Sequence, residues 1–71
     1  MTEEIRAEMV ANVMSVTVAE GERVGAGATL VLLESMKMEI PVLCENAGTV
    51  REIHVSAGDV VQDGDLLVVI G

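Results

Sequence analysis

The chain has 71 residues, enough for one small domain over residues 1–71 but too few for a deep pocket beside a separate scaffold. Its 12 acidic residues against 4 Lys and Arg give a formal net charge of −8, which repels nucleic acid and anionic membrane surfaces. It has no Phe, Tyr or Trp on which a base could stack, so nucleic-acid binding is excluded.

In chain order, the first predicted element is an opening strand over residues 5–11, which would bring the two chain ends close together. Residues 13–34 then predict a strand, a turn, a short strand, a second turn and a strand that contains Leu30 and Leu32. If the Leu32 side chain is buried, Leu32→Ala would lower the free energy of unfolding by about 2–5 kcal/mol.

Residues 50–71 repeat this order, because they align on residues 13–34 without a gap and 7 of the 22 pairs are identical. A glycine between strands allows a positive φ at little steric cost. Two of the identical pairs are such turn glycines: Gly21 with Gly58, and Gly27 with Gly64. The repeat predicts two halves related by approximate two-fold symmetry.

Two hairpins are expected between the halves, around Lys37 and around residues 46–48, at positions related by the repeat. Neither half shows a sustained apolar period of three to four residues, so no long helix is expected. The sum is about eight short strands in an all-β fold, either two small sheets that face each other or one flattened barrel. Only one of the two tips carries an amine, which points to function.

The segment ESMKMEI, residues 34–40, holds the only lysine of the chain, Lys37. Strand-like residues on both sides place Lys37 on a tight turn, where a side chain is most accessible. An ordinary exposed lysine is the simpler interpretation, but the Met-Lys-Met setting at a predicted tip disfavours it. Met36 and Met38 allow two roles, filling gaps in a small core or serving a group bound to the lysine.

Other candidate sites are weaker. Cys44 and His54 have no convincing catalytic partner, so we expect Cys44 to be a small apolar filler and His54 a surface residue. Asp59, Asp63 and Asp65 lack the ligand spacing and the closing Glu of a calcium loop, and we interpret them as turn-forming residues. The sequence therefore predicts no metal site.

The motif and its surroundings resemble the biotinyl/lipoyl attachment family. ESMKMEI is similar to the biotin attachment motif Ala-Met-Lys-Met, AEMVANVMSV at 7–16 to the opening run of the family, and residues 47–70 to its closing segment. The similarity covers nearly the whole chain. It implies a barrel-sandwich hybrid, or hammerhead, of two four-stranded sheets with the lysine on a β-hairpin turn.

The resemblance also implies a function. A biotin protein ligase would attach biotin to Lys37 through an amide, and the biotin arm would shuttle carboxylate between the biotin carboxylase and carboxyltransferase subunits of a biotin-dependent carboxylase. The chain itself would be a free-standing, non-catalytic carrier and a substrate of the ligase. Met36 and Met38 flank the lysine in the motif, and Glu34 and Ser35 belong to its neighbourhood.

Two alternatives remain open. A lipoyl carrier would use the same fold, and Ser35 resembles the residue that lipoyl domains place two positions before their lysine. Lipoyl domains typically have Asp directly before the lysine, however, and the two methionines favour biotin. The third interpretation is an unmodified interaction or regulatory module on the same fold.

A cytoplasmic location is expected. The longest apolar runs, residues 30–33 and 66–70, are far too short to cross a bilayer. The first residues, MTEEIRAEM, are acidic where a secretory signal would be basic and then apolar. A single cysteine cannot form an internal disulfide, which suits a reducing compartment.

Overall fold

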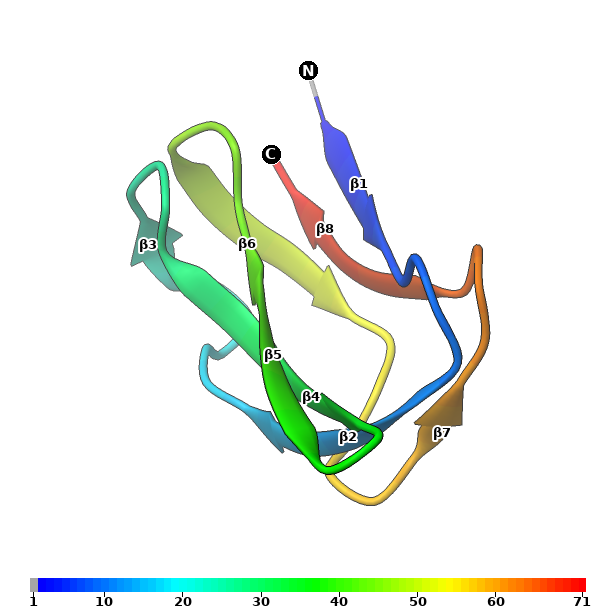
Figure 1. Ribbon diagram of the computed structural model, residues 1–71. Coiled ribbons are helices and arrows are strands. Elements are labelled where there is room, and N and C mark those ends of the chain that lie inside the picture. Colours follow the sequence, from blue (N-terminus) through cyan, green and yellow to red (C-terminus); the bar gives the residue numbers. More distant parts are fainter. Residues whose placement is uncertain (1) are drawn as a thin grey trace.

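The computed structural model describes residues 2–71, which form eight β-strands and contain no helix (Figure 1). The strands are β1 (Glu3–Arg6), β2 (Ala11–Val16), β3 (Arg23–Val24), β4 (Thr29–Ser35), β5 (Met38–Leu43), β6 (Gly48–Ile53), β7 (Val60–Val61) and β8 (Leu66–Ile70). The predicted all-β class is confirmed. The predicted order of strand, short strand and strand appears in each half, as β2–β3–β4 and as β6–β7–β8.

Two four-stranded antiparallel sheets make up the fold. One sheet has the order β1-β8-β6-β3 and holds both chain ends, so we call it the terminal sheet. The other has the order β5-β4-β2-β7, and we call it the lysine sheet because Lys37 joins β4 to β5. The repeat alignment places β6, β7 and β8 on β2, β3 and β4, so the two orders are equivalent and β1 takes the place of β5. The predicted two-fold relation is confirmed.

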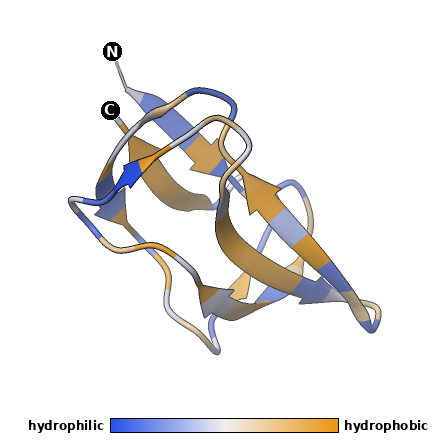
Figure 2. Ribbon diagram, turned by 90° about the vertical axis from the view of Figure 1, so that its left-hand side faces the viewer, coloured by the Kyte–Doolittle hydropathy of each residue, from blue (hydrophilic) through white to orange (hydrophobic). Residues whose placement is uncertain are grey.

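The core lies between the two sheets and is aliphatic apart from one cysteine (Figure 2). Leu30 and Val31 are both buried because a register shift in the β4–β5 pairing, a β-bulge, interrupts the alternation of side chains. Beyond it, Leu33 is only 2% exposed, whereas Leu32 is half-buried. The condition that the Leu32 side chain is buried is therefore not met, because the bulge, which the sequence does not reveal, places Leu33 in the core instead.

The chain ends lie side by side, as predicted, because Glu3 of β1 pairs with Ile70 of β8 (Figure 1). The opening strand is shorter than the expected 5–11. It ends at Arg6, and residues 7–10 lead across to the lysine sheet. Ala7 holds the chain at the point where it leaves the terminal sheet. Its N–H donates to Asp65 O and its carbonyl accepts from the N–H of Gly64, both at 2.8 Å.

The hairpin expected around residues 46–48 is absent from the described fold. β5 ends in the lysine sheet and β6 begins in the terminal sheet, so residues 44–47 cross between sheets. Cys44 anchors the crossing, since its N–H donates to Ala28 O and its carbonyl accepts from the N–H of Gly27. Under the two-fold relation this crossing matches residues 7–10. The position related to the Lys37 turn is the gap between the chain ends.

The turns behave as the repeat predicted. The glycines of both identical pairs have φ between 85° and 96° (Gly21, Gly27, Gly58 and Gly64). Two of the aspartates close turns, because Asp59 Oδ2 accepts from the N–H of Ser56 and Asp65 Oδ2 from the N–H of Gln62, each at 2.9 Å. Within residues 2–71 no group of three or more His, Cys, Asp or Glu side chains is placed to hold a metal ion.

Candidate functional site

Lys37 lies at the tip of the β4–β5 hairpin, at the opposite end of the molecule from the chain ends (Figure 1). Ser35 and Met38 form the last pair of the ladder, which leaves Met36 and Lys37 as a two-residue loop. Both loop residues have positive φ, 53° and 65°. Two positive values in such a loop are typical of a type I′ turn, whose twist matches that of the strands it joins. The predicted hairpin turn is confirmed.

This turn is formed without glycine. Type I′ loops favour Asn-Gly, because the left-handed backbone conformation costs most other residues roughly 1–2 kcal/mol of conformational free energy. Here neither Met36 nor Lys37 has the conformational freedom of glycine, so the strand pairing on both sides holds them in place. The amine is thereby presented on a short, well-defined loop.

Met36→Asn should therefore stabilise the fold. Asn tolerates the left-handed region better than Met does, so we expect the free energy of unfolding to rise by roughly 0.5–1 kcal/mol. Chemical denaturation monitored by circular dichroism measures the change. Met38→Asn is the matched control, since Met38 lies in a strand and should gain nothing; equal stabilisation by both variants would contradict the argument.

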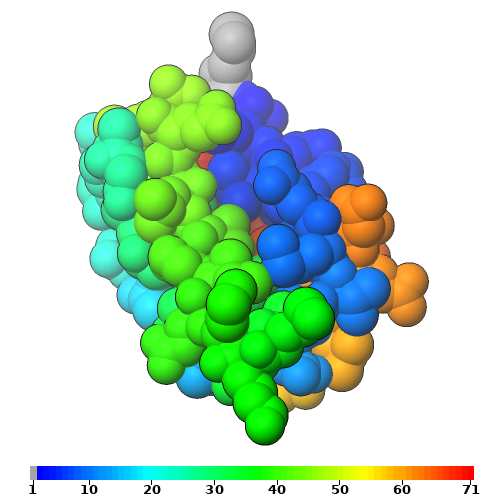
Figure 3. Space-filling model, in the orientation of Figure 1, coloured from blue at the N-terminus to red at the C-terminus, as the bar shows by residue number. Residues whose placement is uncertain are grey.

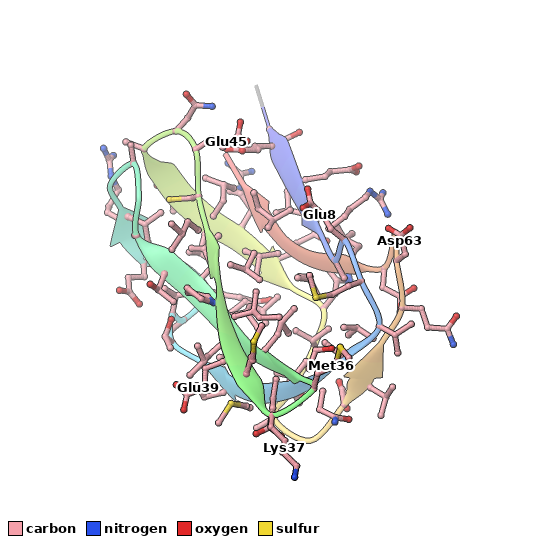
Figure 4. The ribbon with its side chains drawn as sticks, in the orientation of Figure 1. Glu8, Met36, Lys37, Glu39, Glu45 and Asp63 are labelled. Carbon is pink, nitrogen blue, oxygen red and sulfur yellow. The ribbon has the colours of Figure 1, made fainter. Side chains whose placement is uncertain are left out.

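The amine of Lys37 is free in the structure. The side chain is exposed and extends away from the body of the molecule (Figure 4). The close contacts between basic and acidic side chains found among residues 2–71 join Arg6 to Glu4 and His54 to Glu52, and neither involves Lys37. An enzyme can therefore surround the nitrogen without breaking a buried contact.

Met36 and Met38 do not fill the core. Their side chains are 91% and 62% exposed, so the core-filling role is wrong for both. In the space-filling view the hairpin forms one extremity of the molecule (Figure 3). The thioethers flank the lysine as soft, apolar contact surface for whatever encloses the tip.

Glu34, Ser35 and Glu39 lie just behind the tip. Glu34 and Glu39 are directly opposite each other in the β4–β5 ladder, and Ser35 forms the last ladder pair with Met38. Glu39 is exposed, whereas Glu34 and Ser35 are half-buried. Two carboxylates thus face each other beside the Lys37 turn, an arrangement that is unfavourable for strand pairing.

One groove of the described chain lies elsewhere. It has a volume of about 370 Å³ and runs between the segment of residues 3–9 and the segment of residues 40–45. Residues 34–38 do not line it. Lys37 is thus presented outward at a convex tip, which suits a group that another protein must reach.

The remaining candidates have structural positions. Cys44 is buried and its thiol lies 2.9 Å from Gly25 O, so the filler role predicted for it is confirmed. His54 is exposed and its Nε2 lies 2.7 Å from Glu52 Oε1. The described residues contain no helix long and apolar enough to cross a membrane.

The sequence did not single out several exposed aliphatic side chains of the lysine sheet. Met14, Leu43 and Val60 are 39%, 48% and 65% exposed. A signal was available, because the repeat alignment pairs Met14 with Arg51, an apolar residue with a charged one.

The comparisons with known proteins agree with this geometry. The family model described as "Biotin-requiring enzyme" matches residues 3–70. A curated relative from Mycobacterium leprae, the biotinylated protein TB7.3 homolog, is 60% identical over 70 residues, which is 99% of each chain.

Two solved structures show the same fold. The Kluyveromyces lactis urea carboxylase matches with a TM-score of 0.93 and 32% identity over 100% of this chain, which spans only 6% of that protein. The lipoyl domain of the Azotobacter vinelandii 2-oxoglutarate dehydrogenase complex matches with a TM-score of 0.78 and 27% identity, covering 94% of this chain and 95% of that one. The domain is thus similar both to a part of a carboxylase and to a lipoyl domain. From its sequence and its fold, the chain belongs to the biotin/lipoyl attachment family.

Proposed function

We propose that this chain is a biotin carrier protein in which Lys37 carries the biotin. The observation that supports it is a free, exposed amine on a two-residue turn between two exposed methionines. No other lysine competes for modification, because the chain has only this one. The close relative named as a biotinylated protein favours biotin over lipoate.

The chain's own part in attachment is to present a nucleophile. A biotin protein ligase supplies biotin as an acyl adenylate and a base that removes the ammonium proton, and the neutral Nζ attacks the acyl carbon. The amide forms as AMP leaves. The described residues surrounding Nζ offer no ion pair that must break first, so the turn needs no rearrangement.

After attachment the chain works as a tether. Biotin supplies a ureido nitrogen that can hold a carboxylate, while the four-carbon stem of Lys37 and the outward turn let the arm enter a second protein. Tethering raises the effective concentration of the arm at whichever site the carrier docks on. We propose that these sites are a biotin carboxylase and a carboxyltransferase in the cytoplasm, and that the chain itself catalyses neither step.

Intact-protein mass spectrometry tests the proposal directly. Purified chain incubated with a biotin protein ligase, ATP and biotin should gain one biotinyl group, and fragmentation should place it on Lys37. A lipoyl increment on protein from native cells would instead support a lipoyl carrier. A chain that stays unmodified with active ligase, while binding a partner stably, would contradict the carrier function and favour an interaction module.

A further inference from the structure

The exposed apolar side chains and the arginines of the chain lie on different sheets. Among residues 2–71, the large hydrophobic side chains that remain exposed all belong to the strands of the lysine sheet, to its turn or to the connection entering it: Met9, Val10, Met14, Met36, Met38, Leu43 and Val60. The three arginines all belong to strands of the terminal sheet: Arg6, Arg23 and Arg51. Because the two halves have the same backbone arrangement, the different distribution of apolar and arginine side chains comes from the sequence and not from the fold.

The repeat provides an internal comparison of the two outer faces. The gap-free alignment pairs Met14 with Arg51 and Val60 with Arg23. The strand registers extend this comparison to the edge strands β5 and β1. Leu43 pairs with Thr29 of β4, and Arg6 pairs with Leu66 of β8. Because the repeat aligns Thr29 with Leu66, Leu43 and Arg6 occupy equivalent positions. At three equivalent exposed positions, an aliphatic residue of the lysine sheet therefore replaces an arginine of the terminal sheet.

These aliphatic residues share the face of the lysine sheet that points away from the core. Val60 and Met14 alternate with the buried Val61 and Val13 along β7 and β2. On β4 and β5 the same face carries the half-buried Leu32, which pairs with the exposed Pro41. A monomeric protein gains nothing from exposed aliphatic side chains where its own fold accepts arginine, so contiguous ones indicate an interaction surface.

The charges at the edge of this face indicate the partner. Glu34 and Glu39 oppose each other in the ladder, and the repeat alignment places them on Gly71 and Thr2, whose side chains carry no charge. The four strands of the lysine sheet contain no Lys or Arg, so the nearest cation in the hairpin is Lys37 in the turn, whose charge is lost when its amine is acylated. A second copy docked through this same face would bring like charges together, whereas a surface with a cationic edge would neutralise them.

We propose that the outer face of the lysine sheet, formed by Met14, Leu32, Pro41, Leu43 and Val60, docks on an aliphatic surface bordered by Arg or Lys on the biotin carboxylase subunit. The proposal rests on the proposed carrier function and names the partner surface it requires. The carboxylase is a better occupant than the ligase, because apolar interfaces are typical of lasting assemblies and a ligase has to release its product.

The test exchanges residues between the two faces. Met14→Arg with Val60→Arg gives the lysine sheet the side chains that the terminal sheet already carries in equivalent backbone positions, so the fold should tolerate them. Arg51→Met with Arg23→Val is the matched control. Leu43→Arg is a second, single variant in case the double variant fails to fold, which thermal unfolding will show.

Two measurements separate the possible partners. Calorimetric titration with the purified biotin carboxylase subunit should show binding weakened roughly tenfold or more for both lysine-sheet variants and unchanged for the control. The rate of biotinylation by the ligase should stay at the wild-type level in all of them. Unchanged carboxylase binding would overturn the proposal, and so would a loss confined to ligation, which would assign the face to the ligase.

The two proposals can fail separately. Binding to the carboxylase subunit is measured on the chain before and after incubation with ligase, so the docking face is judged on affinity in either case. A wild-type chain that gains no biotin contradicts the carrier function alone.

Discussion

Lys37→Arg should give a folded protein that gains no biotin from a ligase even with excess biotin and long incubation. Arginine keeps the positive charge and the length of the side chain, so the turn and the fold should be unaffected. Its guanidinium stays protonated at any working pH and cannot act as the nucleophile. The chain has no second lysine to take over, so the loss should be complete. Intact mass and streptavidin binding measure it.

The control asks whether any exposed amine is sufficient. Arg23 is exposed on a short strand of the terminal sheet. Arg23→Lys in the Lys37→Arg background restores one lysine to the chain but places it outside the hairpin turn. We expect this variant to remain unmodified, because the ligase must enclose a convex tip. A biotinyl group on Lys37→Arg would show that the attachment site is not the turn, and one found only on the variant with both changes would show that any exposed lysine is sufficient.

Leu33→Ala should destabilise the domain far more than Leu32→Ala, although the two leucines are neighbours. Leu33 is 2% exposed between the sheets, so truncation leaves a cavity and should lower the free energy of unfolding by about 2–5 kcal/mol. Leu32 is half-buried on the outer face, where loss of its side chain should cost only about 1 kcal/mol. The loss expected for Leu33→Ala is a large part of the whole, because a chain of 71 residues has a free energy of unfolding of only roughly 4–10 kcal/mol.

Urea titration of both variants against the parent chain measures this difference. The comparison is internally controlled, because the two substitutions remove the same atoms from adjacent positions of one strand. A larger loss for Leu32→Ala than for Leu33→Ala would mean that Leu32 faces the core and that the β-bulge before Val31 does not form in solution, and equal losses would also contradict the expectation. A Leu33→Ala chain too unstable to fold at room temperature would agree with the expectation, provided that Leu32→Ala folds.

The pattern of local residues was sufficient to predict the elements of the fold. Paired glycines with positive φ, β-branched runs between them and the repeat itself led to an all-β fold with two-fold symmetry, which the structure confirms. The Lys37 turn was predictable for the same reason, because a hairpin depends on residues close together in the chain. Its proposed role as the attachment site follows from the family resemblance and stays a prediction.

Relations between distant residues were not predictable in this way. Residues 46–48 resemble a hairpin locally, but they cross between sheets because Gly48 begins a strand that pairs with β3 and β8. Leu33 lies in the core and Leu32 on the outer face because the register with β5 shifts at a bulge. Neither register nor bulge is encoded in one strand alone, since each depends on which partner strand lies alongside.

Local patterns along the chain were enough to establish the strands, the internal repeat and the single lysine in a Met-Lys-Met segment. The packing of the two sheets was needed to learn that both methionines face solvent, and that the exposed aliphatic side chains gather on one sheet while the arginines lie on the other. The exposure of a side chain depends on the surfaces that pack together and not on its own segment alone. A side chain is buried or exposed according to which distant segments pack against it, and in this fold those contacts form when the two sheets pack around their common core.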